Sequence, residues 1–279
     1  MPPTLLVLAS IASVQFGAAF AKTLFDELGA GGTVFLRTLV AAIVLALIWR
    51  PRVAGHDRRD LGLALVFGLV LAAMNFCFYS SHERIPLGIA VTFEFVGPLG
   101  VAVFGSRRPL DLLWVGLAAT GILLLADFGG GDLDRLGVAL ALLAGVLWAA
   151  YILLSARVGR AFPAGAGLAL AMLVATVPLA PVGIADAGGE FLVPGILLAG
   201  IAVGLLGSAI PYALELEALR TLPVGVFGVL MSLEPAVAAL AGFVVLGEGL
   251  VTRELVAIAL VVVASAGAAW GATVAPRDA

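Results

Sequence analysis

Ten apolar runs, each close to twenty residues long, dominate this chain of 279 residues. They lie at about 4–21, 31–49, 61–80, 87–105, 110–128, 136–156, 164–183, 191–213, 224–246 and 251–272. A helix needs about 20 apolar residues to cross roughly 30 Å of hydrocarbon, and these runs are continuous rather than alternating, which excludes barrel strands. The chain is 62% hydrophobic and 12% charged, with a mean hydropathy of +1.18. The sequence therefore predicts an all-α polytopic membrane protein with ten transmembrane helices and no soluble domain.

The second half of the chain repeats features of the first half at a constant shift of 137 residues. The matched pairs include Pro86 with Pro223, Pro98 with Pro235 and Asp111 with Glu248. This shift displaces the pattern by five helices, and an odd displacement reverses the direction of each helix through the membrane. We therefore expect two inverted five-helix repeats, residues 1–130 and 131–279, a construction typical of secondary transporters.

The basic residues are unevenly divided between the two sides of these spans. One side holds ten of them, Arg50, Arg52, Arg58, Arg59, Arg107, Arg108, Arg157, Arg160, Arg220 and Arg277. The other side holds four, Lys22, Arg84, Arg135 and Arg253. Because basic residues concentrate in cytoplasmic loops, both termini are expected in the cytoplasm.

Arg37 and Glu94 are charged residues inside apolar runs, both on the order of 10 Å deep from the same side. Charged groups at such depth usually face the bundle interior and have a partner, so these two residues are candidates to pair with each other. The pair could be structural, or Arg37 could instead reach outward to Asp26 or Glu27. It could equally be a functional pair that opens when substrate or a proton arrives.

Glu234 lies about 15 Å deep, near the middle of the ninth run, and no basic residue other than Arg37 reaches a comparable depth. Burial away from water favours the neutral form of a carboxyl group, which suits a group that binds a proton on one side and releases it on the other. The structural alternative is a protonated glutamate bonded to a backbone carbonyl that Pro235 frees. We expect Glu94 to be the more structural of the two glutamates and Glu234 the more mechanistic.

Neutral polar and aromatic side chains at intermediate depth could line a small cavity for an amphiphilic solute, although such groups also serve helix packing. They are Gln15, Asn75, Tyr79, Trp148, Tyr151, Ser208 and Tyr212. Prolines near this depth would interrupt helical hydrogen bonding and free backbone carbonyls toward the cavity. They are Pro86, Pro98, Pro211, Pro223 and Pro235.

Signatures of other classes of protein are missing from the sequence. His56 and His82 fall in loops on opposite sides, so no pair for a metal or a nucleophile is available. Gly129-Gly130-Gly131 lacks the lysine of a phosphate-binding loop and is interpreted as a connector between the halves. Cys77 is the single cysteine, which excludes an internal disulfide. No enzyme activity, cofactor, metal or nucleic-acid partner is expected.

Several stretches carry a resemblance to a known family. They are Ser13-Val14-Gln15-Phe16-Gly17-Ala18-Ala19, Leu24-Phe25 with Gly29, Leu36-Arg37, Ile85 through Pro98, Ser106-Arg107-Arg108, Asp111, Leu233-Glu234-Pro235 and Leu246-Gly247-Glu248. Over essentially its full length the chain resembles the drug/metabolite transporter superfamily with two EamA-type repeats, and within it the bacterial threonine and homoserine exporter group.

The resemblance implies export of small amino acids or related metabolites across the inner membrane, in exchange for protons. Combined with the inverted repeats, it predicts a secondary active transporter that works by alternating access, as a monomer or a homodimer in the lipid bilayer. An exporter or importer of other metabolites or drugs is the alternative within transport. A membrane scaffold or accessory subunit without a solute path is the alternative outside transport.

Overall fold

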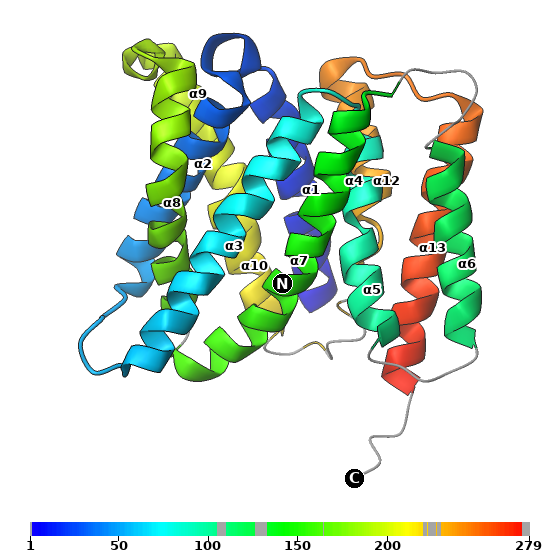
Figure 1. The fold of residues 1–279 in the computed structure, drawn as a ribbon, viewed down its shortest axis with the longest axis horizontal. Coiled ribbons are helices and arrows are strands. Elements are labelled where there is room, and N and C mark those ends of the chain that lie inside the picture. Colours follow the sequence, from blue (N-terminus) through cyan, green and yellow to red (C-terminus); the bar gives the residue numbers. More distant parts are fainter. Residues whose placement is uncertain are drawn as a thin grey trace.

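The computed structural model of the chain is helical throughout the part it describes (Figure 1). The described residues are 2–104, 110–125, 133–163, 165–219, 222, 227, 230–274. Four sequence predictions lie outside them: the motif at Ser106–Arg108, the connector at Gly129–Gly131, the boundary after residue 130 and the role of Pro223. The side chain of Asp111 lies outside them as well.

Three long helices begin the chain: α1 (Pro3–Lys22), α2 (Phe25–Trp49) and α3 (Arg58–His82). The second starts six residues earlier than its apolar run predicts, because it includes a short stretch that precedes a kink at Gly29, where φ is 65° and ψ is 171°. Glycine adopts this left-handed backbone readily, whereas side chains with a Cβ rarely do. The chain therefore bends at Gly29 and enters the bundle as an apolar helix from Ala30 onward.

The predicted span at 87–105 consists of two short helices, α4 (Leu87–Glu94) and α5 (Val96–Phe104), interrupted at Phe95. Pro98 has no N–H to donate to the carbonyl of Glu94, and its ring crowds that carbonyl. The helix α12 (Glu234–Ala241) begins in the same way, after a break at Ser232 and Leu233, with Pro235 in its first turn. It continues into a π-helical turn, η3 (Gly242–Leu246).

The predicted span at 191–213 is longer than expected. After a short 3-10 turn, η1 (Glu190–Leu192), it runs through α9 (Pro194–Gly204), a π-helical turn η2 (Leu205–Ala209) and α10 (Ile210–Leu219). The remaining long elements are α6 (Leu110–Leu125), α7 (Arg135–Ala161), α8 (Ala166–Ala187) and α13 (Thr252–Val274).

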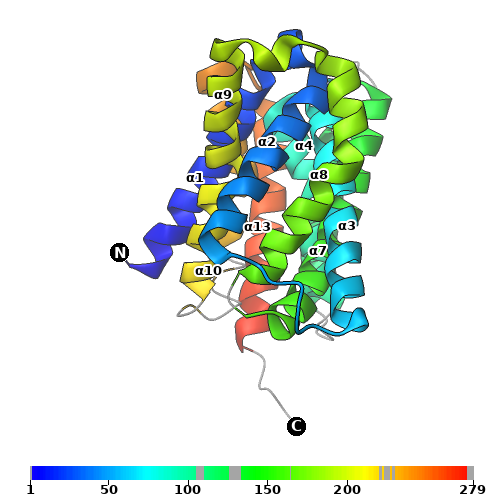
Figure 2. The ribbon, with the colours of Figure 1, turned by 90° about the vertical axis from the view of Figure 1, so that its left-hand side faces the viewer.

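The helices pack side by side in one bundle, with α2 and α8 at one edge and α6 with α13 at the other (Figure 1). Between these edges α4 packs on α12, α3 packs on α7 and α1 packs on α10. The view from the side shows that most helix axes run roughly parallel to one another, across the longest direction of the molecule (Figure 1 and Figure 2). Elements far apart in the sequence are therefore neighbours across the whole molecule.

The outer surface of the bundle is strongly apolar. Exposed side chains include Val177 at 71%, Leu198 at 69%, Leu47 at 69% and Val146 at 66%. Six described helices are long and apolar enough to cross a membrane, and three shorter described segments are also apolar. An aqueous protein rarely exposes so much contiguous apolar surface. The prediction of an all-helical polytopic membrane protein is confirmed at this level.

Candidate functional site

Arg37 lies in the middle of α2 with 5% of its surface exposed. Its guanidinium donates through Nη1 to Oδ1 of Asn75 on α3 and through Nη2 to the carbonyl oxygen of Gly207 on η2, each at 2.5 Å. The same group lies 5.1 Å from the centre of the Tyr79 ring, within the range of cation–π attraction. Neutral groups from two other elements therefore hold this buried cation.

Two backbone carbonyls of the π-helical turn η2 accept hydrogen bonds from side chains of α1 and α2. Pro211 has no N–H and so cannot donate to the carbonyl of Gly207 four residues earlier. That carbonyl accepts from Arg37 instead, and the neighbouring carbonyl of Leu206 accepts from the Ser13 hydroxyl at 2.7 Å. A Cβ on Gly207 would lie 2.8 Å from Nε of Arg37, so bare backbone is needed at this contact. The irregular turn thus leaves backbone carbonyls free to accept hydrogen bonds from side chains of other helices.

Arg37 and Glu94 do not touch. The structure describes both residues, yet no ion pair within 4 Å joins them, and Arg37 does not reach outward to Asp26 or Glu27 either. The reason is geometric, because the fork of the guanidinium is already occupied by Asn75 and Gly207. The charge of Arg37 still acts on Glu94 through space.

Three carboxyl groups lie near one another, of which Glu94 and Glu234 are buried and Glu215 is half-buried. Glu94 is the last residue of α4, Glu234 is the first residue of α12, and Glu215 lies on α10. Glu94 and Glu215 both lie within electrostatic range of Glu234. Glu94 stands at the C-terminal end of a half-helix and Glu234 at the N-terminal end of another, so the backbone dipoles around them have opposite sign. The two glutamates therefore occupy different electrostatic environments.

Glu215 was missed by the sequence analysis, which ended the eighth run at residue 213. The structure continues α10 past it, and Oε1 of Glu215 accepts a hydrogen bond of 2.7 Å from the Ser10 hydroxyl on α1. Helical spacing was the available signal, because Ser208, Tyr212 and Glu215 follow one another at intervals of four and three residues and so share a face.

The predicted aromatic residues surround the same region. Tyr212 lies within electrostatic range of Arg37, Glu94, Glu215 and Tyr79. Tyr151 lies within range of Tyr212 and Glu215. The Tyr151 ring also stacks on Phe67, with centroids 5.2 Å apart. Trp148 lies nearly one turn before Tyr151 on α7, where its ring makes an edge-to-face contact with Phe95 at the break between α4 and α5. The structure thus brings the three tyrosines together, and Trp148 contacts Phe95 at the helix break.

Three buried polar atoms in this region have no hydrogen-bond partner: Oε1 of Gln15 on α1, Nε of Arg37 and the hydroxyl oxygen of Tyr79. Gln15 is 4% exposed, and Ser208 on η2 is 2% exposed. Buried polar atoms are nearly always paired in folded proteins. An unsatisfied acceptor and an unsatisfied donor therefore indicate a place where a polar molecule can bind.

Three of the prolines stand near the starts of the broken helices, and Pro211 lies inside the continuous helical run from Pro194 to Leu219. Pro86 is the N-cap of α4, Pro98 is the third residue of α5, Pro211 the second of α10 and Pro235 the second of α12. The positions of Pro86, Pro98 and Pro235, in or before a first turn, tolerate a missing N–H better than a helix interior does, whereas Pro211 removes one bond from the interior of its helical run. The three prolines near helix starts fix where the helices break, and the breaks in turn place Glu94 and Glu234.

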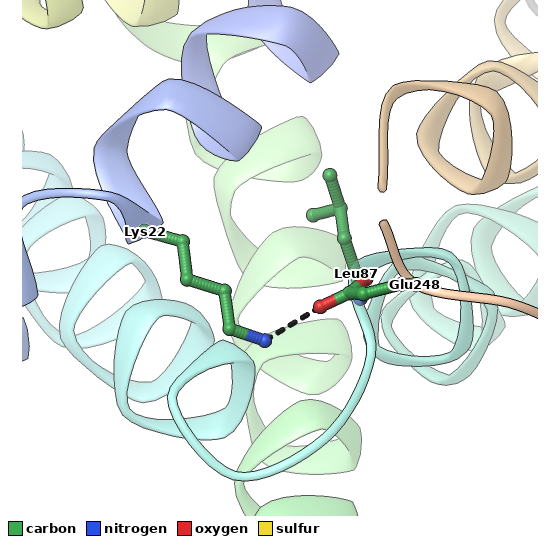
Figure 3. A network of polar contacts seen from close by, with 3 residues as sticks. All are labelled: Lys22, Leu87 and Glu248. Carbon is green, nitrogen blue, oxygen red and sulfur yellow. Dashed lines mark hydrogen bonds and ion pairs between the residues drawn. The ribbon is translucent and has the colours of Figure 1, made fainter. Parts of the chain in front are cut away.

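One end of the bundle is tied together by Glu248, which follows η3 (Figure 3). Its Oε1 accepts from Nζ of Lys22, the last residue of α1, at 2.7 Å. Its Oε2 accepts from the backbone N–H of Leu87, the first residue of α4, at 2.8 Å. Both groups are largely covered, with 24% of Lys22 and 15% of Glu248 exposed. One carboxylate therefore joins α1, α4 and the segment before α13.

Comparison with known proteins places this arrangement in a wider context. The chain is 43% identical to the threonine/homoserine exporter RhtA of Salmonella typhimurium (strain LT2), over 95% of this chain and 90% of that protein. It is 42% identical to the threonine/homoserine exporter RhtA of Escherichia coli (strain K12), with the same coverage. A solved crystal structure shares the fold with a TM-score of 0.66 at 20% identity, over 96% of both chains.

Residues 135–270 also match the EamA-like transporter family. The resemblance to EamA-type transporters that the sequence motifs predict is confirmed. A transporter, unlike an enzyme, accounts for polar residues inside an apolar bundle. The chain belongs to the EamA-like transporter family.

Proposed function

We propose that this protein exports threonine, homoserine or a closely related small amino acid across the inner membrane in exchange for protons. The observation that carries the proposal is the largely buried cluster in which Arg37, Glu94 and Glu215 lie within electrostatic range of Tyr212, and Glu234 within range of both glutamates. The names of the relatives supply the substrate class, and the cluster offers groups that match it.

The chemistry of a zwitterionic amino acid fits the composition of the site. A guanidinium is suited to a substrate carboxylate, since charge-assisted hydrogen bonds are about twice as strong as neutral ones. The Nε of Arg37 remains without a partner and could donate to that carboxylate. The carboxyl groups of Glu94, Glu215 and Glu234 are suited to the substrate ammonium, and the orphan Oε1 of Gln15 can accept from a hydroxyl.

Two inverted five-helix repeats, residues 1–130 and 131–279, are the framework that we infer for transport. In support, the helix break at Phe95 recurs at Ser232, at the same shift of 137 residues as the prolines. The packing is consistent with a pseudo-twofold relation, because α2 with α8 and α6 with α13 would be pairs of equivalent helices. The arginine distribution supports ten spans with both termini in the cytoplasm.

Alternating access follows from this framework, with the site at the repeat interface opening to one side at a time. The contact of Lys22 with Glu248 ties the two repeats together at one end of the bundle, and its breakage would open that end. Glu234 is our candidate for the proton-coupling group, because it lies at the break of α12 beside two other carboxyl groups. Glu94 is the candidate for the more structural role.

Proteoliposomes test this proposal directly. Vesicles with an acidic interior should accumulate labelled threonine through the native protein, since protons leaving the vesicle would drive the amino acid inward. Glu234→Gln should lose this gradient-driven uptake and keep the exchange of labelled for unlabelled threonine across the membrane. Full proton coupling in Glu234→Gln would remove Glu234 from the role. A native protein that moves neither amino acid would overturn the function itself.

A further inference from the structure

A cavity of about 620 Å³ lies between the start of α3 and the end of α7, away from the central site. Its walls come from two helices that pack against each other. They are Arg59, Asp60, Gly62, Leu63 and Val66 of α3, and Arg157, Arg160 and Ala161 of α7. The start of α3 and the end of α7 lie at the end of the bundle toward which α13 runs, and α1 ends at the opposite end (Figure 1).

Three guanidinium groups and one carboxyl group surround this cavity. The ion pairs within 4 Å that the structure describes lie elsewhere, so none of these three arginines has a carboxylate at that distance. Arg157 makes one long bond of 3.4 Å, to the carbonyl of Leu153 in its own helix. Each guanidinium carries five N–H donors in a planar fork. The cavity therefore presents an excess of positive charge and many free donors.

Apolar surface continues from the cavity along both helices. Val66 lines the cavity and is 48% exposed, and Leu69, nearly a turn farther along α3, is 46% exposed. On α7, Leu153 lies one turn before Arg157 and is 52% exposed. Gly62 adds room, because a Cβ at that position would meet nothing within 4 Å. A ligand with an anionic head and apolar chains would satisfy the charged and the apolar parts together.

We infer that this cavity binds the phosphate headgroup of an anionic phospholipid, with its acyl chains along the exposed faces of α3 and α7. Basic pockets between membrane helices commonly hold such headgroups. The phosphodiester accepts hydrogen bonds from Arg59 on one helix and from Arg157 and Arg160 on the other, so the lipid links α3 to α7. Inorganic phosphate shares the anionic chemistry and lacks the acyl chains, which makes it the discriminating comparison.

Lipid binding to the purified full-length protein is the test. Native mass spectrometry should show retained phosphatidylglycerol, and adding this lipid to detergent micelles should raise the thermal unfolding temperature. Phosphatidylcholine and inorganic phosphate should raise it much less. The double variant Arg157→Gln with Arg160→Gln should bind phosphatidylglycerol roughly fivefold more weakly for each arginine removed. Equal stabilisation by phosphatidylcholine or by phosphate alone would overturn the proposal.

Two further variants distinguish lipid binding in this cavity from general attraction of the lipid to surface charge. Arg52 is exposed in the segment between α2 and α3 and does not line the cavity, so Arg52→Gln should bind the lipid as the native protein does. Gly62→Leu keeps every charge and fills part of the open space, so it should weaken binding. Loss of binding in Arg52→Gln, or native binding in Gly62→Leu, would show that diffuse charge attracts the lipid and would refute a site.

Discussion

Nζ of Lys22 lies 2.7 Å from Oε1 of Glu248, a residue 226 positions later in the chain. The other oxygen of the same carboxylate caps α4 through the N–H of Leu87. The carboxylate thus has two separable functions, an ion pair with α1 and a hydrogen bond to the first turn of α4. Replacing the lysine removes the ion pair alone, because the cap does not depend on it.

Lys22→Met should therefore loosen this end of the bundle without unfolding α4. The native chain supplies a reporter, because Cys77 is its single cysteine and is 7% exposed on α3, within electrostatic range of Glu94. A partly covered ion pair is worth up to about 1 kcal/mol, so a membrane-impermeant maleimide added from the Lys22 side should label Cys77 up to about fivefold faster.

The matched control for this variant is Arg84→Met, which removes the looser ion pair of 3.7 Å with Asp134. Both partners there are about 40% exposed, so the pair should contribute little and labelling should stay at the native rate. Unchanged labelling in Lys22→Met would show that the contact with Glu248 does not hold this end closed.

Arg37→Lys should impair transport more than it impairs folding. The two amino groups of the guanidinium bind acceptors on two different elements, Asn75 on α3 and Gly207 on η2. A lysine ammonium has no planar fork and cannot reproduce this geometry. We expect a loss of about 1 kcal/mol in unfolding free energy and at least about a tenfold loss of threonine export. Arg84→Lys, at an exposed site, should change neither quantity, and native export by Arg37→Lys would show that the fork is dispensable.

The sequence predicts features that depend on one segment of the chain better than features that depend on contacts between distant segments. The apolar runs predicted helices correctly, because hydrophobic length is a property of one segment. The interruption at Phe95 follows from Pro98 three residues later. The kink inside α2 depends on the positive φ of Gly29, which its apolar run does not reveal.

The candidate site was predictable only as a list of residues at similar depth. Which of them meet is decided by packing between elements far apart in sequence: Arg37 binds Gly207, 170 positions away, and Ser10 binds Glu215, 205 positions away. The pairing of Arg37 with Glu94 looked plausible because charge and depth matched. It is not formed, since depth says nothing about the direction in which each helix faces. The roles assigned to these residues stay predictions.

Glu215→Gln should reduce transport and leave the fold intact. The amide oxygen of glutamine can still accept the hydrogen bond from Ser10, so the contact between α1 and α10 is kept. The neutral side chain cannot carry the negative charge that a substrate ammonium or a proton requires, so threonine export should fall by about tenfold, a loss of about 1.4 kcal/mol. Glu190 in η1 is exposed, and Glu190→Gln should export at the native rate. Native export by Glu215→Gln would exclude this carboxyl group from the site.

Gly145→Ala should destabilise the protein by about 1–3 kcal/mol, the usual cost of overpacking a tight contact. A Cβ at this position of α7 would lie 2.6 Å from the carbonyl oxygen of Glu94, and a Cβ on Gly97 would run into the carbonyl of Gly145. Gly100→Ala is the matched control, because nothing lies within 4 Å of a Cβ there and alanine favours a helix. Thermal unfolding in detergent measures both. Equal unfolding temperatures for the two variants would contradict the close backbone contact between α7 and the break after α4.

Pro211→Ala should slow transport without lowering stability. The new N–H at position 211 would compete with Arg37 for the carbonyl of Gly207, and removal of the pyrrolidine ring would let η2 relax toward a regular α-helix. Arg37 would then lose an acceptor that its guanidinium needs, whereas the helix itself would gain a hydrogen bond. Pro178 lies inside α8 and is exposed on the outer surface, so Pro178→Ala restores a helix N–H far from Arg37 and should export at the native rate. If Pro211→Ala exports threonine as fast as Pro178→Ala, the irregular turn serves only packing and its free carbonyls are not part of the transport site.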